Sequence, residues 1–148
     1  MPILTAAYQA EVKAWLASFP SSQEPPPFYL AGHSMGCRVA IQVALLNGDC
    51  QGLILFSYPL IGAGKNKEPR LAGLEQISSR SLSISGNRDA LCPTDLWQKI
   101  LQDLPLFTLH VLNHGDHSLA VPAKIKPASG QDLFEAEVIQ ALRQFKEP

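Results

Sequence analysis

Residues 32–36, Gly-His-Ser-Met-Gly, constrain the fold of this 148-residue chain more than any other segment. They lie between a short apolar run at 28–31 and an apolar, Ala-rich run at 39–46. The first run is typical of a short strand, and the second of a helix. Glycines on both sides of the turn allow the chain to reverse sharply and the strand and helix to approach each other. The sequence therefore predicts a tight strand-to-helix turn with Ser34 at its tip.

Strands and helices alternate along the rest of the chain. Apolar runs predict further strands at 52–58, 81–85 and 106–112. Apolar residues at three- and four-residue steps predict helices at 3–19, near 71–77, at 96–104 and from Asp132 onwards. Asn47 and Gly48 are a typical helix C-terminal stop, and Thr94 or Asp95 could cap the helix at 96–104. This order predicts βαβ units with right-handed crossovers.

The predicted fold class is α/β, with a mainly parallel sheet of about four strands flanked by helices. A chain of 148 residues with 46% hydrophobic content is long enough for one domain with a real core. We therefore expect a single domain over residues 1–148.

Charge and cysteine content exclude several classes of protein. Twelve basic and 13 acidic residues leave a net charge of −1, too small to attract nucleic acid or an anionic membrane. Cys37, Cys50 and Cys92 are odd in number and lack C-x-x-C spacing, so we expect reduced thiols. The N-terminus lacks the features of a signal peptide and no apolar stretch approaches 18 residues, which predicts a cytoplasmic protein if Met1 is the true start.

Three polar residues each follow a different predicted strand, at the end where loops of a parallel sheet converge. Ser34 is in the G-x-S-x-G turn, Asp89 follows the strand at 81–85, and His117 follows the strand at 106–112. An imidazole oriented by a carboxylate can deprotonate a serine and make it nucleophilic. The N–H of Met35, at the start of the next helix, could stabilise a developing oxyanion. The alternatives without a catalytic role are that residues 32–36 form a small-residue turn common to α/β proteins and that Asp89 is a solvated turn aspartate.

The histidine could be any of three, because His110, His114 and His117 all lie near the fourth strand. His110 falls inside the strand and is expected to be structural, whereas the turn before His117 could carry it back over the strand ends. His114, Asp116 and His117 could instead bind a metal, but their spacing within one loop lacks the helical presentation of a zinc motif. We therefore prefer His117 as the base, with no metal and no cofactor.

Four segments together resemble the α/β-hydrolase superfamily. They are residues 32–36 (Gly-His-Ser-Met-Gly), 57–60 (Ser-Tyr-Pro-Leu), 86–89 (Gly-Asn-Arg-Asp) and 115–119 (Gly-Asp-His-Ser-Leu). The likeness is to dienelactone-hydrolase-like proteins, most closely the testis-expressed hydrolase-like and NSL-complex subunit 3 group. It implies that Ser34, Asp89 and His117 are nucleophile, acid and base, and that a small ester-like substrate is cleaved without a cofactor.

The chain departs from this family at its N-terminal side. The family has about four strands before its nucleophile, whereas this sequence has room for one helix and a proline-rich turn. The chain is then the C-terminal part of the fold, and the loop that supplies the second oxyanion donor is absent. The strand from Phe28 to Ala31 becomes an apolar edge, which could pair two copies as a homodimer.

Three explanations fit this departure: a shortened gene model, which we favour, a true truncation that dimerises, or a fragment without activity. The leading expectation is a serine esterase or thioesterase acting through an acyl-enzyme. The alternative is a non-catalytic interaction module.

Overall fold

The computed structural model describes residues 1–64, 67–125 and 133–146. Four parallel strands form one sheet in the order β1-β2-β3-β4. They are β1 (Tyr29–His33), β2 (Gly52–Phe56), β3 (Arg80–Gly86) and β4 (Phe107–Leu112). Every pair is parallel, because a helix or a long connection returns the chain to the same end of the sheet between strands. The predicted α/β class with about four parallel strands is confirmed.

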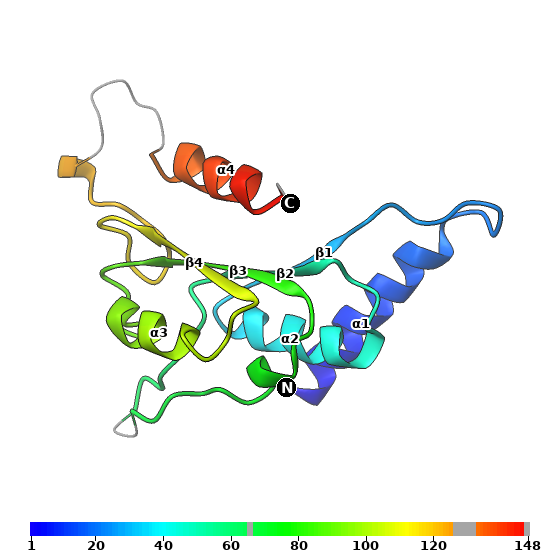
Figure 1. Ribbon diagram of the computed structural model, residues 1–148, viewed down its shortest axis with the longest axis horizontal. Coiled ribbons are helices and arrows are strands. Elements are labelled where there is room, and N and C mark those ends of the chain that lie inside the picture. The colour runs from blue at the N-terminus through cyan, green and yellow to red at the C-terminus, as the bar shows by residue number, and fades with distance from the viewer. Residues whose placement is uncertain (65–66, 126–132, 147–148) are drawn as a thin grey trace.

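Helices cover both faces of this sheet (Figure 1). They are α1 (Pro2–Ala17), α2 (Met35–Asn47), α3 (Thr94–Leu101) and α4 (Leu133–Lys146), with short 3₁₀ turns η1 (Leu74–Gln76) and η2 (Ala123–Ile125). Figure 1 shows α2 and α3 on one face and α4 on the other. Because all four strands are parallel, their carboxyl ends lie at one edge of the sheet, where their loops meet.

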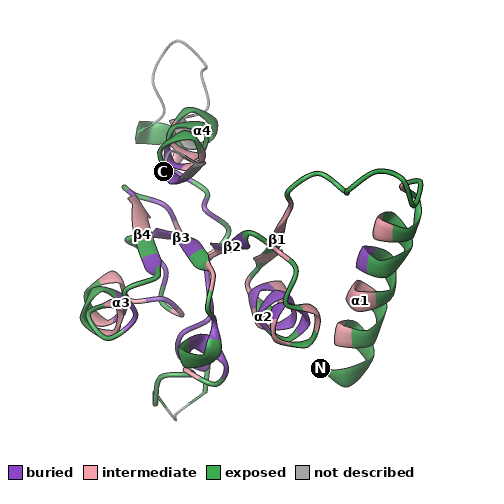
Figure 2. Cartoon of the chain, turned by 45° about the vertical axis from the view of Figure 1, so that its right-hand side comes forward, coloured by how far each residue is buried: buried purple, intermediate pink, exposed green. Residues whose placement is uncertain are grey.

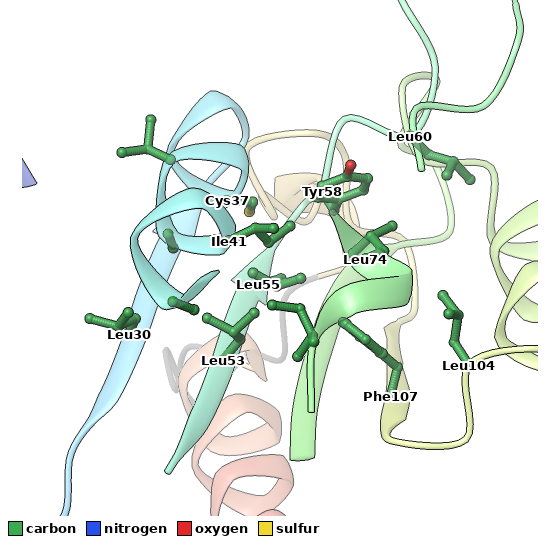
Figure 3. Close-up of a cluster of buried hydrophobic side chains, with 14 of the residues drawn as sticks. Leu30, Cys37, Ile41, Leu53, Leu55, Tyr58, Leu60, Leu74, Leu104 and Phe107 are labelled. Carbon is green, nitrogen blue, oxygen red and sulfur yellow. The ribbon is translucent and has the colours of Figure 1, made fainter. Parts of the chain in front are cut away.

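The main core lies between the sheet and the layer of α2 and α3. Leu53 and Leu55 of β2 are fully buried there against Ile41 of α2, as the close-up in Figure 3 shows. Trp97 of α3 is also fully buried, and its indole N–H donates to Ser83 Oγ at 2.8 Å. The continuous apolar sequence of β2 follows from cover on both of its faces.

A smaller cluster packs α4 onto the opposite face. Leu82 and Ile84 of β3 meet Ala141 and Phe145 of α4. The apolar face predicted for the closing helix is therefore its contact with the sheet. Asp132, the expected start of that helix, lies outside the described residues.

Strand β1 is an edge strand, as its sequence context predicts. Helix α1 lies beside this edge and packs on α2, and Figure 2 shows α1 exposed along most of its length. Val12 is its one buried residue among those described. The Tyr8 hydroxyl bonds to both polar groups of Ala31, donating to its carbonyl at 3.0 Å and accepting from its N–H at 3.2 Å. One side chain thus covers the middle of the edge.

Some helix ends differ from their predictions. Helix α2 begins at Met35, directly after the turn, and not at 39. The N-cap of α3 is Pro93, not Thr94 or Asp95, because the extended Pro93 backbone (ψ 117°) already lets its carbonyl accept from Trp97 N–H at 3.0 Å. The predicted stop at Gly48 is confirmed by its left-handed φ of 68°.

Two further sequence-based expectations concern thiols and membranes. Cys37, Cys50 and Cys92 are all free thiols. No helix within the described ranges is long and apolar enough to cross a bilayer.

Candidate active site

Ser34 occupies a strained backbone position between β1 and α2. Its φ is 52° and its ψ is −118°, and it is the N-cap of α2. A positive φ is uncommon for a residue with a Cβ, and such strain gathers at functional sites. The Ser34 N–H donates to the Phe56 carbonyl at 2.9 Å, which ties the turn to β2. The turn therefore holds the serine at the carboxyl end of the sheet.

Gly32 is the glycine that makes this turn possible. A Cβ on Gly32 would lie 2.3 Å from the backbone of Gly36 and 2.5 Å from that of Cys37, so no side chain fits. A Cβ on Gly36 would meet nothing within 4 Å. The expectation that both glycines are needed for the strand and helix to approach is thus wrong for Gly36. Only the missing side chain of Gly32 makes room, and the Gly36 backbone occupies that room.

The Cys37 thiol stabilises the turn through hydrogen bonds to backbone carbonyls. It is fully buried and donates to the carbonyls of Gly32 at 3.0 Å and Phe56 at 3.2 Å. Burial raises the pKa of Cys37 far above the ordinary thiol range. This cysteine therefore packs as a neutral donor and not as a nucleophile.

Asp89 lies in the turn after β3 with its side chain fully buried. Its Oδ1 accepts from the N–H groups of Leu91 at 2.8 Å and Cys92 at 3.2 Å. These amides orient the carboxylate, and its second oxygen, Oδ2, lies 2.9 Å from His117 Nδ1.

His117 joins the serine to this carboxylate. Its Nε2 lies 2.8 Å from Ser34 Oγ, and its side chain is 30% exposed. An ionised carboxylate only accepts, so Nδ1 carries the proton and Nε2 is left free to accept from the Ser34 hydroxyl. The structure thus brings the three predicted residues into one hydrogen-bonded series, and this arrangement can transfer the serine proton to the imidazole.

Two polar side chains hold the loop that carries His117. Asp116 Oδ1 accepts from the N–H groups of Ser118 at 2.8 Å and Ala120 at 3.0 Å. Asn87, two residues before Asp89, accepts at Oδ1 from the His114 N–H at 2.8 Å. The turn after β3 and the loop after β4 are therefore bonded to each other.

The other two histidines are placed elsewhere. His110 lies within β4, as expected, with its Nε2 3.8 Å from Glu137 of α4. His114 is exposed, and its backbone has a φ of 64°. Within the described ranges no group of three His, Cys, Asp or Glu side chains could hold a metal, including the suggested set of His114, Asp116 and His117.

Met35 is the first residue of α2, so its N–H has no acceptor within the helix. Met35 is 53% exposed, so this end of the helix is accessible. The positive end of the helix dipole and this free amide are suited to stabilise an anion beside Ser34.

Two residues of this site could not be identified from the sequence. His33 Nε2 donates to the His117 carbonyl at 2.9 Å, across 84 positions of sequence. Asn87 links two loops through its side chain. Both residues lie inside the motifs at 32–36 and 86–89, but nothing local to either motif indicates the distant partner.

Comparison with known proteins gives a family and a fold. A family model described as an alpha/beta hydrolase domain matches residues 1–147. The structure is similar to that of a protein of unknown function from Agrobacterium tumefaciens, provisionally named an alpha/beta hydrolase (TM-score 0.67, 16% identity, covering 97% of this chain and 61% of that one).

Two further solved structures share the fold. An alpha-beta serine hydrolase homologue from Coxiella burnetii matches with a TM-score of 0.57 and 20% identity, covering 92% of this chain and 54% of that one. A protein from Klebsiella pneumoniae provisionally named a dienelactone hydrolase matches with a TM-score of 0.56 and 19% identity, covering 81% and 52%. These likenesses are of fold, and this chain spans between about half and 61% of the length of the three proteins.

Proposed function

Because this chain belongs to the alpha/beta hydrolase domain family, we propose that it is a cofactor-independent serine hydrolase that cleaves small esters or thioesters. The observation that supports this most is the position of His117 between Ser34 Oγ, at 2.8 Å, and Asp89 Oδ2, at 2.9 Å. Both distances are within hydrogen-bonding range without movement of the backbone. The narrower likeness to the testis-expressed and NSL-complex subunit 3 group is part of the proposal and rests on the four sequence segments.

In the proposed first step, His117 Nε2 accepts the Ser34 proton while Ser34 Oγ forms a bond to the substrate carbonyl carbon. Asp89 stabilises the resulting imidazolium through Nδ1–H. The carbonyl electron pair moves onto oxygen, facing the Met35 N–H. When the tetrahedral intermediate collapses, the bond to the alkoxide or thiolate breaks and that group takes the proton from Nε2, leaving an acyl-enzyme.

In the second step, His117 takes a proton from water, and the water oxygen bonds to the acyl carbon. The bond to Ser34 Oγ then breaks, the serine regains a proton from Nε2, and the carboxylic acid leaves. The proton that Ser34 loses to the leaving group is replaced by one from water, so Ser34 and His117 end as they began and the cycle needs no cofactor.

A fluorophosphonate probe tests the proposal directly, since it reacts with activated serine hydroxyls. We expect covalent labelling at Ser34 in folded protein, and loss of labelling in Ser34→Ala. Ser118→Ala is a matched control, because Ser118 is an exposed serine on the same loop as His117. Folded wild-type protein that stays unlabelled would contradict the proposal.

A second candidate function is an interaction module in which two copies pair through β1. It is supported by the position of β1 at the edge of the sheet and by an open groove of about 350 Å³ beside it. Phe28 and Tyr29 line this groove together with Trp15 and other residues of α1. An edge strand next to apolar side chains is suited to strand pairing.

A further inference from the structure

His33 is the second residue of the turn segment, and the proposed mechanism gives it no role. It ends β1, its side chain is exposed, and its Nε2 lies 2.9 Å from the His117 carbonyl oxygen. A carbonyl can only accept, so His33 must carry its proton on Nε2 and act as the donor. The two imidazole rings are 5.5 Å apart.

The sheet topology explains why His117 needs a hydrogen bond to β1. Strands β1 and β4 are at opposite edges of the sheet, so the loop after β4 must cross the ends of β2 and β3 to reach Ser34. In the described part of the chain, two hydrogen bonds join this loop to the segment at 33–34. One is from Ser34 Oγ to the His117 side chain, and the other is from His33 to the His117 backbone.

These two bonds differ in one respect that matters for catalysis. Once Ser34 is acylated, its oxygen has no proton to donate, so the bond to His117 Nε2 is lost. The bond from His33 to the His117 carbonyl involves no reacting atom and survives acylation. Asp89 still orients the ring from the other side through Nδ1.

We propose that His33 is a positioning residue that holds the His117 backbone over Ser34, most importantly in the acyl-enzyme, when His117 must activate water. This inference rests on the proposed hydrolase function. It predicts that loss of the His33 donor slows deacylation more than it slows the first attack by Ser34.

The test compares wild type with His33→Leu and His33→Gln. Leucine removes the donor, whereas the glutamine side-chain N–H₂ reaches about as far as the histidine Nε2 and restores it. His114→Asn is the matched control, since His114 is an exposed histidine on the loop after β4 and asparagine tolerates its positive φ.

Two rates separate the steps of the reaction. Phosphonylation of Ser34 by the fluorophosphonate reports the attack, and the burst and steady-state phases of p-nitrophenyl acetate hydrolysis report acylation and deacylation. In His33→Leu we expect deacylation to fall about three- to tenfold, as for one exposed hydrogen bond, with less than a twofold change in phosphonylation. His33→Gln should recover most of the loss, and His114→Asn should behave as wild type.

Ring ¹⁵N–¹H spectra of His117 give a readout that is independent of activity. His33→Leu should broaden the His117 ring signals, because the ring is held less firmly, and His33→Gln should leave them as sharp as in wild type. Signals as sharp in His33→Leu as in wild type would overturn the inference, as would deacylation equally slow in the leucine and glutamine variants. If wild-type Ser34 is not labelled at all, the hydrolase function fails, and the spectra alone decide whether His33 positions His117.

Discussion

Gly86 and Gly115 meet where the turn of Asp89 crosses the loop of His117. A Cβ on Gly86 would lie 2.1 Å from the Gly115 carbonyl oxygen and 2.8 Å from its Cα. The Arg88 N–H donates to the same carbonyl at 2.9 Å. Two backbones in direct contact thus set the separation of Asp89 and His117, which side chains alone could not do as rigidly.

We predict that Gly86→Ala is strongly destabilising, because the methyl group can be accommodated only by moving backbone. The free energy of unfolding should fall by at least about 3 kcal/mol, as for a severe steric change in a core. Urea unfolding followed by the fluorescence of the buried Trp97 measures this loss.

Gly36→Ala is the matched control. An added Cβ there meets nothing within 4 Å, and the residue is in the first turn of α2. Alanine should leave stability unchanged or raise it by about 0.5–1 kcal/mol, because it favours the helix and restricts the unfolded chain. Equal losses in the two variants would contradict the close contact at Gly86.

The second prediction concerns Asp89→Asn. The N–H groups of Leu91 and Cys92 require an oxygen at the Oδ1 position, so the new amide nitrogen must face His117. His117 Nδ1 would then accept, Nε2 would carry the proton, and Ser34 would lose its acceptor. Turnover of p-nitrophenyl acetate should fall by about 10³- to 10⁴-fold, the scale of a tautomer error in such a site.

Asp95→Asn is the control for this change. Asp95 is an exposed residue in the first turn of α3, where its sequence position suggests only a role as a helix cap. Its variant should keep wild-type turnover. Activity that survives Asp89→Asn with intact folding would show that Asp89 does not orient His117.

The main features of the fold could be predicted from local patterns. Leu53 and Leu55 are in a continuous apolar run because β2 is covered on both faces, and Gly48 ends α2 because only a residue that tolerates positive φ fits there. The three site residues could be selected because each follows a strand, and the ends of parallel strands converge.

The remaining features depend on contacts between distant segments. The hydrogen bond from His33 to His117 joins residues 84 positions apart. The contact of Gly86 with Gly115 exists only once β3 and β4 have paired. The error at the start of α3 has a local cause. Thr94 and Asp95 are both good caps by residue type, but the extended backbone of Pro93 places the N-cap before either of them, which composition does not express.

The third prediction concerns alkaline pH. The pKa of the Cys92 thiol is raised to about 11: burial raises it most, a hydrogen bond from Ser85 lowers it, and the nearby Asp89 charge raises it slightly. In the unfolded chain the thiol ionises near its ordinary value of about 8.5. Between these values the folded state keeps a proton that the unfolded state releases, so stability falls as pH rises.

This contribution is fully present below about pH 8.5 and should be lost by about pH 11, which lowers the free energy of unfolding by about 3 kcal/mol. Cys92→Ser is the comparison, because serine keeps a hydroxyl for Ser85 but does not ionise in this range. Urea midpoints measured from pH 8 to 11 should fall less steeply in the variant. Parallel curves would show that Cys92 is not the group responsible.

The last prediction concerns pairing through β1. The Tyr8 hydroxyl occupies both polar groups of Ala31, which would otherwise face a second strand. If two copies pair along this edge, Tyr8→Phe should strengthen the dimer by freeing one donor and one acceptor. Ala31→Lys should weaken it, because Ala31 is exposed on the edge and lysine there opposes strand addition.

Ile139→Lys is the control, since Ile139 is 41% exposed on α4, which packs on β3 and β4. Sedimentation velocity over a concentration series should rank the dimer as Tyr8→Phe above wild type and Ile139→Lys, with Ala31→Lys lowest. Identical sedimentation of all four proteins would rule out the β1 edge as the interface between copies.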